Sequence, residues 1–406
     1  MLERVRNTQR PEPELDPGPE GATRTARPPV QGSGRGRVLY LDAVRAVALA
    51  RVLLYHSLRQ DWVLVFGSMP LMFFVSGSLF ATSMDRRDAG SVVRSRYRRI
   101  LPSYWFYVAA MMVLWAALGV LWELSWFDWI SFAMPVISLG GPQGPGAGTD
   151  LSLTWGLLWY LQMHLILALV GPFLRRAQQR RPLLLWTGLL SLAAVVWLTG
   201  TPAVLAFLFT GCWILGYHHN DGHLREALRR FWWAIALGCS TAVAALVLTT
   251  SGSSGTAGAV RAATVLVGLI GIFWLIVAVR VQPIVEPWLL GRRTRSTLSW
   301  ASRRSLTIYL WHIVPIYAAL AIPLPGSSSW AGRIAWCLAG TLVAVVMFGW
   351  IEDVAGRRRI ELWPTSSGEA RIAGSSVVRR ALGRLPISRQ GPIDLREGRD
   401  LRRPSS

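Results

Sequence analysis

The stretch Leu41–His56, LDAVRAVALARVLLYH, places Asp42, Arg45, Arg51 and His56 in a segment otherwise apolar enough to cross a bilayer. Ionisable groups in hydrocarbon cost about 2.5–3.5 kcal/mol each on insertion scales and normally face a polar cavity. Because a helix turns about 100° per residue, Asp42, Arg45 and His56 fall on nearly one stripe, with Arg45 and His56 about 16 Å apart. Arg51 points to roughly the opposite side. The stripe predicts a lined pathway or an active site.

The composition is that of an integral membrane protein. The chain has 406 residues, of which 52% are hydrophobic and only 16% charged, against about 25% charged in soluble domains. Its 21 tryptophans suit interfacial aromatic belts. The net charge of +21 would indicate nucleic acid as the partner of a soluble protein. Here the arginines cluster in short loops between apolar segments, so we expect the lipid bilayer and no nucleic acid as partner.

Ten apolar segments predict an all-α protein with about ten transmembrane helices, since roughly 20 apolar residues span a bilayer. They lie near residues 38–58, 63–83, 101–121, 152–173, 183–200, 203–217, 231–250, 260–281, 305–322 and 331–351. We therefore predict a disordered tail over 1–36, a ten-helix membrane domain over 37–355 and a basic, largely disordered tail over 356–406.

Arginines alternate between the connections in a regular way. They concentrate before the first segment and in every second connection after it, near residues 35–37, 86–99, 175–181, 225–230, 292–304 and 357–359. The other connections are acidic or rich in Gly, Pro and Ser. The positive-inside rule then predicts a multi-pass plasma-membrane protein with both termini in the cytoplasm.

Four motifs, in order along the chain, carry a family resemblance. They are Arg45 with His56 after ten intervening residues, Met72-Phe-Phe-Val-Ser-Gly77, Arg96-Tyr-Arg-Arg99 leading into the third segment, and Ser305-Leu-Thr-Ile-Tyr-Leu-Trp-His312. Together they resemble membrane acyltransferase family 3, over roughly residues 38–355. There are two departures. The fourth segment, Thr154–His164, lacks a Glu that many relatives carry. Two positions after Glu352 this chain has Val354, where relatives have Pro.

The resemblance implies an O-acyltransferase that moves an acyl group, most simply acetyl, from acyl-CoA to a hydroxyl of a cell-envelope or secreted glycan, glycolipid or small metabolite. We expect no metal, because the three cysteines lie in apolar segments without zinc spacing. His56 is the candidate general base or acyl carrier, and Arg45 and Asp42 join it as catalytic candidates.

Arg96 and Arg99, at the predicted cytoplasmic face, are the candidates for binding the phosphates of acyl-CoA. Tyr309 and His312 complete the predicted donor site. In this hypothesis, the pantetheine arm carries the thioester from the arginines towards His56, and the acceptor arrives from the other side.

Other interpretations stay open at this stage. Asp42 and Arg45 could form an ordinary i, i+3 ion pair, and the arginines at 96 and 99 could be topology signals alone. A transporter is the alternative function, since polar stripes also line transport paths. We interpret His218, His219 and His223 as part of a solvated arginine-rich loop, not as a metal site, and Arg51 has no assigned role.

Overall fold

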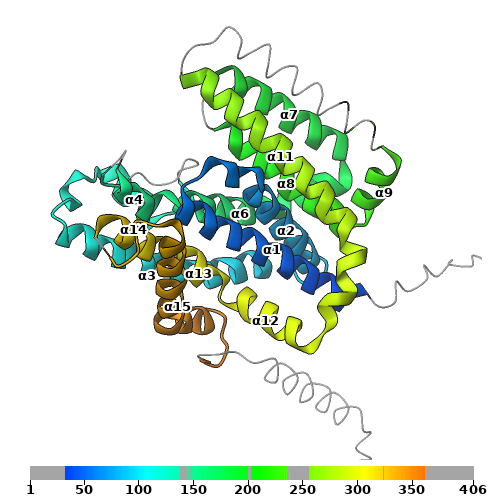
Figure 1. The fold of residues 1–406 in the computed structure, drawn as a ribbon. Helices are drawn as coiled ribbons and strands as arrows, with labels where there is room; N and C mark the ends of the chain where they lie inside the picture. Colours follow the sequence, from blue (N-terminus) through cyan, green and yellow to red (C-terminus); the bar gives the residue numbers. More distant parts are fainter. Residues whose placement is uncertain are drawn as a thin grey trace, which may run out of the picture.

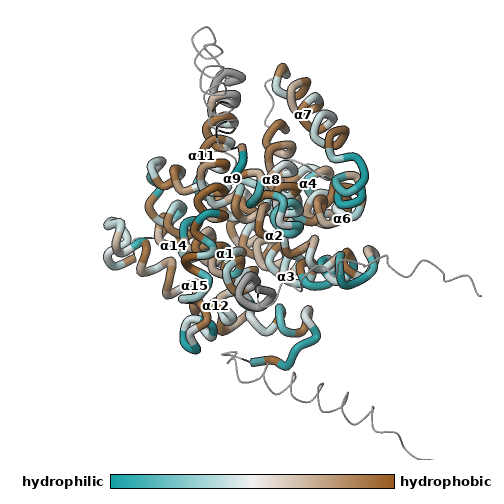
Figure 2. The backbone as a smooth tube through the Cα atoms, turned by 90° about the vertical axis from the view of Figure 1, so that its right-hand side faces the viewer, coloured by the Kyte–Doolittle hydropathy of each residue, from teal (hydrophilic) through white to brown (hydrophobic). Residues whose placement is uncertain are grey.

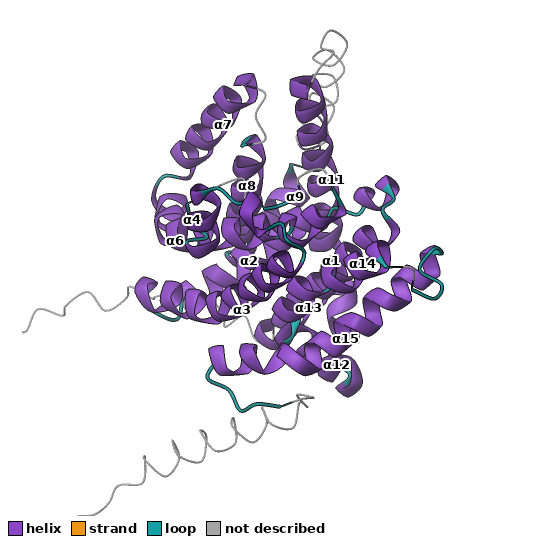
Figure 3. Ribbon diagram, turned by 90° about the vertical axis from the view of Figure 1, so that its left-hand side faces the viewer, coloured by secondary structure: helices purple, strands orange, loops and turns teal. Residues whose placement is uncertain are grey.

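The computed structural model describes residues 33–137, 144–146, 149–199, 203–231, 233, 235, 237, 256–322 and 324–361. Within these ranges the regular structure consists of helices, with no strand (Figure 3). The α-helices are α1 (Ser33–Leu58), α2 (Ser68–Met84), α3 (Ala89–Ala117), α4 (Trp126–Ala133), α5 (Leu153–Gly156), α6 (Leu158–Arg180), α7 (Pro182–Thr199), α8 (Val204–Asn220), α9 (His223–Arg230), α11 (Thr256–Val285), α12 (Arg292–Arg303), α13 (Ser305–Trp311), α14 (Ile313–Ala321) and α15 (Trp330–Ala355). Short 3-10 turns are η1 (Asp61–Val65), η2 (Leu121–Glu123), η3 (Asp150–Ser152) and η4 (Glu286–Leu290).

The apolar segments predicted from the sequence form helices wherever the structure describes them. The predicted segment at 231–250 lies largely outside the described residues, and each of the other nine coincides with a helix or a pair of helices. Within the described ranges, five helices are long and apolar enough to cross a membrane, at Ala89–Ala117, Asp150–Arg180, Pro182–Thr199, Thr264–Leu290 and Trp330–Ala355. Figure 2 shows that α7 and the coloured part of α11 are mostly apolar. An all-helical membrane protein is thereby supported.

The helix α2 lies at the centre of the bundle (Figure 1). It packs most extensively on α8 and also contacts α1 and α11. The helices α2 and α8 approach each other closely at two glycines. A Cβ added to Gly77 would lie 2.1 Å from the Trp213 carbonyl oxygen, and one added to Gly216 would lie 2.3 Å from the Phe74 carbonyl oxygen. Only glycine fits against a backbone at this distance, so Gly77 and Gly216 permit the close approach of α2 and α8.

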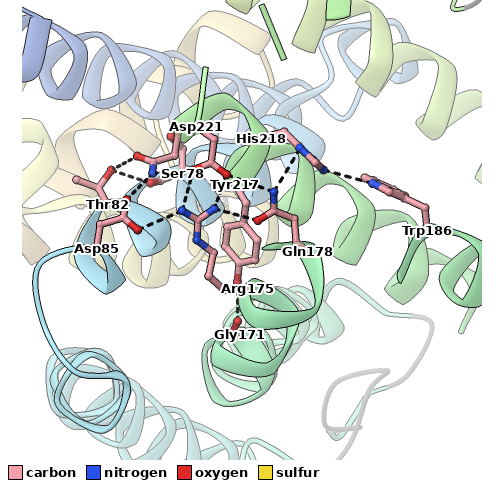
Figure 4. Close-up of polar contacts among 11 residues, drawn as sticks. Ser78, Thr82, Asp85, Gly171, Arg175, Gln178, Trp186, Tyr217, His218 and Asp221 are labelled. Carbon is pink, nitrogen blue, oxygen red and sulfur yellow. Dashed lines mark hydrogen bonds and ion pairs between the residues drawn. The ribbon is translucent and has the colours of Figure 1, made fainter. Parts of the chain in front are cut away.

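One end of the bundle is tied together by a buried arginine (Figure 4). Arg175, near the end of α6, donates to both carboxylate oxygens of Asp221 after α8 at 2.7 Å and to Asp85 after α2 at 3.1 Å. The sequence predicted that these three helix ends share one side of the membrane, and the structure brings them together. At another end of the fold, Arg59 after α1 pairs with Asp150 before α6 at 2.8 Å.

Two segments predicted as loops are helical. Asp88 caps α3, its carboxylate accepting from the Ser91 backbone N–H at 2.7 Å, so α3 begins at Ala89 and carries Arg96 and Arg99 on its own turns. Likewise α8 continues to Asn220 and therefore includes His218 and His219. A left-handed Gly222 (φ 83°) then turns the chain into α9.

Candidate active site

A cavity of about 120 Å³ opens between helices that are far apart in the sequence. Four of the predicted site residues, Arg45, Arg96, Arg99 and Tyr309, line it together. The remaining lining residues are Met72, Ser76, Ile100, Tyr160, Leu161, His164, Ser302, Arg303, Ser305, Leu306, Glu352 and Arg358. All four motifs that were separate in the sequence thus contribute side chains to one space, the second of them through Met72 and Ser76.

The exposed side of this cavity is strongly basic. Arg96 is half-buried, whereas Arg99 and Arg358 are exposed. Among the described residues, no carboxylate lies within ion-pair distance of any of these three guanidinium groups. Arg45 has one ion pair, a long contact of 3.9 Å to Asp42. Since a guanidinium presents forked, permanently charged donors, this side of the cavity is suited to phosphate groups.

The other side of the cavity is buried and aromatic. Ser76, Tyr160, His164 and Tyr309 are each less than a tenth exposed. The rings of Tyr160 and Tyr309 lie 5.1 Å apart between centroids. The Tyr309 hydroxyl donates to the Leu157 carbonyl oxygen at 2.6 Å, which fixes this ring at the cavity wall. A ligand with a charged head and a neutral arm would match this change from arginines to buried aromatic groups.

Glu352 is the acidic residue of the cavity lining. Its Oε1 accepts from both the backbone N–H and the hydroxyl of Thr307, the latter at 2.7 Å. These bonds join α15 to α13 and hold the carboxylate at the beginning of the helix that carries Tyr309. The resemblance pointed to Glu352, and the structure places it in the cavity despite the change at Val354.

His56 and His312 lie beside each other, with ring centroids 5.4 Å apart. Neither belongs to the cavity lining. The His312 ring lies 6.0 Å from the Tyr309 ring, between centroids, so Tyr309 neighbours both the cavity and the histidine pair. The stripe predicted on α1 is therefore divided: Arg45 lines the cavity, and His56 lies beyond Tyr309 and His312.

The hydrogen bonds of His312 indicate its tautomer. Nδ1 lies 2.7 Å from the Tyr309 carbonyl oxygen, which can only accept, so Nδ1 carries the proton. In the neutral ring Nε2 is then an acceptor, and it is buried with no hydrogen-bond partner among the described residues. Such an unsatisfied buried acceptor is uncommon. It is available to accept a hydrogen bond from a neighbouring group.

The comparison with protein families decides the class of this protein. A family profile described as an acyltransferase domain matches residues 38–351. The chain belongs to acyltransferase family 3. It is accordingly an acyltransferase enzyme, and the apolar helices agree with a membrane location. Comparisons with curated proteins and with solved structures gave no match.

In this acyltransferase, Asp42 connects α1 to α12. The Ser302 hydroxyl donates to Asp42 Oδ1 at 2.8 Å, and Arg45 lies 3.9 Å from the same oxygen. The i, i+3 ion pair considered from the sequence is present, and it does not remove Arg45 from the cavity. Asp42 thus lies between Ser302 and Arg45 and links α12 to α1.

Arg51 has a structural role that the sequence did not reveal. Its Nε donates to the Val63 carbonyl oxygen at 2.9 Å and one terminal nitrogen donates to the Ser68 hydroxyl at 2.8 Å. The guanidinium also lies over the Tyr55 ring, 5.4 Å from its centroid. Arg51 therefore fastens the turn η1 and the start of α2 to α1, on the side of α1 away from the stripe.

Histidines outside the site are engaged in structural hydrogen bonds. His218 Nε2 accepts from the Trp186 indole at 3.3 Å, and His219 lies between Ser78 at 3.1 Å and Gln282 at 2.9 Å. Within the described residues, no group of three or more His, Cys, Asp or Glu side chains could hold a metal ion. The prediction that these histidines belong to a solvated loop is wrong for His219, which is buried.

Sequence reasoning missed part of the cavity. Neither Tyr160 nor His164 was proposed as a site residue from the sequence. Both line the cavity from α6, whose motif departs from the usual family pattern. Arg358 was counted only as one of three basic residues after the last segment. The sequence did offer one indication of its position. Arg358 follows Glu352 by six residues, and Glu352 and Arg99 line the same cavity.

Proposed function

We propose that this acyltransferase moves an acetyl group from cytoplasmic acetyl-CoA to a hydroxyl of a cell-envelope or secreted glycan, glycolipid or small metabolite. One observation carries the proposal: a basic cavity whose arginines at positions 96, 99 and 358 have no carboxylate partner among the described residues. Acyl-CoA has several phosphates at one end and a neutral arm ending in a thioester at the other. Its charge distribution matches that of the cavity.

In the proposed reaction, Arg96 and Arg99, supported by Arg45, bind the phosphates. The pantetheine arm passes along the buried side of the cavity, next to Tyr309. The acceptor oxygen forms an ester bond to the acetyl carbon while the carbon–sulfur bond of the thioester breaks. The hydroxyl proton goes to His56, and the CoA thiolate is protonated in turn.

His312 would support His56 in this step. Its ring neighbours His56, and its Nε2 is an unoccupied acceptor. A His56 that receives the acceptor proton on one ring nitrogen can donate a hydrogen bond from its other nitrogen to this site, which stabilises its positive charge. A route in which His56 first carries the acetyl group uses the same neighbours.

For topology, we propose ten membrane spans with both termini in the cytoplasm, in the plasma membrane. The joining of the ends of α2, α6 and α8 at Arg175 supports a common side for these arginine-rich ends. The cavity mouth at Arg99 and Arg358 is formed by arginine-rich segments that the arginine alternation also assigns to the cytoplasm, where acetyl-CoA is found.

The direct test is transfer of label. Membranes containing the full chain would be incubated with acetyl-CoA labelled in its acetyl group, together with the cell-envelope glycan and lipid fractions. We expect label in an ester with an acceptor for the wild type and none above background for His56→Ala. His223→Ala is the matched control, because this histidine is exposed on α9 and outside the cavity lining.

Two outcomes would overturn the proposal. Full transfer by His56→Ala would remove this histidine from the chemistry. Wild-type membranes that neither transfer label nor bind acetyl-CoA would favour the transporter, for which the same polar interior would serve as a path.

A further inference from the structure

The chain turns back immediately after the last long helix. The backbone N–H groups of Gly356, Arg357 and Arg358 donate to carbonyl oxygens in the final turn of α15, the last of them to Asp353 at 2.8 Å. Arg357 adopts a left-handed conformation with φ 54°, which is uncommon for a residue other than glycine. The segment Gly356–Glu361, here called the strap, is thus directed back along the bundle.

A buried ion-pair network holds the strap. Asp353 and Arg304 are each only 1% exposed, and a guanidinium nitrogen of Arg304 lies 2.7 Å from Asp353 Oδ2. The same carboxylate oxygen accepts from the Glu361 backbone N–H at 3.3 Å, and Arg304 also donates to the Glu361 carbonyl oxygen. Arg303 lies 3.6 Å from the Glu361 carboxylate. Breaking a buried pair strands a charge, so this arrangement fixes the strap firmly.

The strap brings one of its three arginines to the cavity. Arg358 lines it, whereas Arg357 and Arg359 do not. Within the described part of the chain, Arg358 has no ion pair, although acidic side chains of the network lie nearby in sequence. These acids are occupied by Arg303 and Arg304, which leaves the charge of Arg358 available at the exposed side of the cavity.

We propose that Arg358 is a donor-specificity residue: it binds a phosphate of the acyl-CoA at the cavity mouth and is held there by the strap. The inference rests on the proposed acyl-CoA-dependent function. The uncharged pantetheine arm suits the buried end beside Tyr309, so the phosphates remain at the exposed end. There Arg358 extends the positive surface begun by Arg96 and Arg99.

The test compares two donors on the purified full chain in lipid nanodiscs. Equilibrium binding is measured for labelled acetyl-CoA and for S-acetylpantetheine, which lacks phosphate. We expect Arg358→Ala to raise the Kd for acetyl-CoA about tenfold, because one charge-assisted hydrogen bond is lost. The Kd for S-acetylpantetheine should not change. Arg359→Ala, which alters an exposed neighbour outside the cavity, should change neither.

The outcomes separate this inference from the function on which it rests. A wild type that does not bind acetyl-CoA would overturn both. A wild type that binds it while Arg358→Ala binds equally well would overturn the role of Arg358 alone, as would an equal loss for both donors. Partial recovery of acetyl-CoA affinity in Arg358→Lys, with an unchanged melting temperature in every variant, would support a phosphate contact over a structural role.

Discussion

The two arginine centres of this protein differ in their partners. At the end of α6, Arg175 is 4% exposed and is bonded to Asp221, Asp85 and Gln178 (Figure 4). In the cavity, Arg96 and Arg99 lie near Arg45 and one another with no carboxylate in ion-pair distance among the described residues. The guanidinium of Arg175, here called the paired centre, is neutralised by the protein's own carboxylates. The arginines at 96 and 99, here called the unpaired centre, are not.

The difference in ion pairing indicates which arginines stabilise the fold and which bind a ligand. A guanidinium neutralised by two carboxylates holds helix ends together and has no free charge for a ligand. Several arginines around one cavity repel each other, so they lower the stability of the empty protein and gain energy when an anion binds. The paired centre should therefore affect stability, and the unpaired centre should affect donor binding.

The largest expected effect is on stability at the paired centre. Arg175→Ala should lower the free energy of unfolding by about 3 kcal/mol, because removing one partner of a buried pair leaves uncompensated charge. Unfolding of the purified protein by a denaturing detergent measures this loss. Arg176→Ala, which alters the exposed neighbour, is the control and should be neutral. Equal stability of the two variants would contradict the structural role of Arg175.

Next in size is donor binding at the unpaired centre. Arg96→Ala should weaken acetyl-CoA binding by about 1.5–3 kcal/mol, the contribution of a hydrogen bond to a charged group. Its unfolding free energy should stay the same or rise, since a repelling charge is removed. Equilibrium binding and an unfolding curve on the same sample check both parts. A stability loss as large as that of Arg175→Ala would erase the distinction between the centres.

Acidification should weaken the ion pairs of Arg175. Partial burial would raise the pKa of Asp221, but the hydrogen bonds and charge of Arg175 outweigh it and hold the pKa below the usual value of 3.8. A lowered folded-state pKa gives stability that is present above the unfolded value and lost as pH falls through the folded one. Melting temperature against pH should thus fall in acid for the wild type and less for Asp221→Asn. Parallel curves would contradict this coupling.

The smallest effect is expected at Asp42. Its contact with Arg45 is 3.9 Å long and partly exposed, and such pairs contribute about 0.2–1 kcal/mol. Asp42→Asn should therefore change stability by less than about 1 kcal/mol. Its acetyl-CoA affinity should not decrease, because Arg45 keeps its charge. A marked loss of binding would show that Asp42 holds Arg45 in place more firmly than this distance indicates.

The helices were predictable because apolar run length reflects bilayer thickness. The ion pair between Asp42 and Arg45 was predictable because it lies within one helical turn. The start of α3 was not, since the arginines at 96 and 99 look like a loop until Asp88 is recognised as its cap.

The tertiary partners were beyond sequence reasoning. Arg175 and Asp221 are 46 positions apart, and no local pattern distinguishes a paired arginine from the unpaired one at position 99. The position of Arg358 depends on a buried pair, Arg304 with Asp353, that closes across 49 positions. The motifs identified which residues gather in the site, and the packing decided which of them share the cavity.

The most direct test of the central claim is the effect of CoA on thermal stability. A ligand that binds only the folded state raises the melting temperature by an amount that grows with the ratio of its concentration to its Kd. We predict that millimolar CoA stabilises the wild type and Arg176→Ala, and leaves the double variant Arg96→Ala/Arg99→Ala unchanged. An equal shift in the double variant, or no shift in the wild type, would contradict the assignment of the unpaired arginines to the donor.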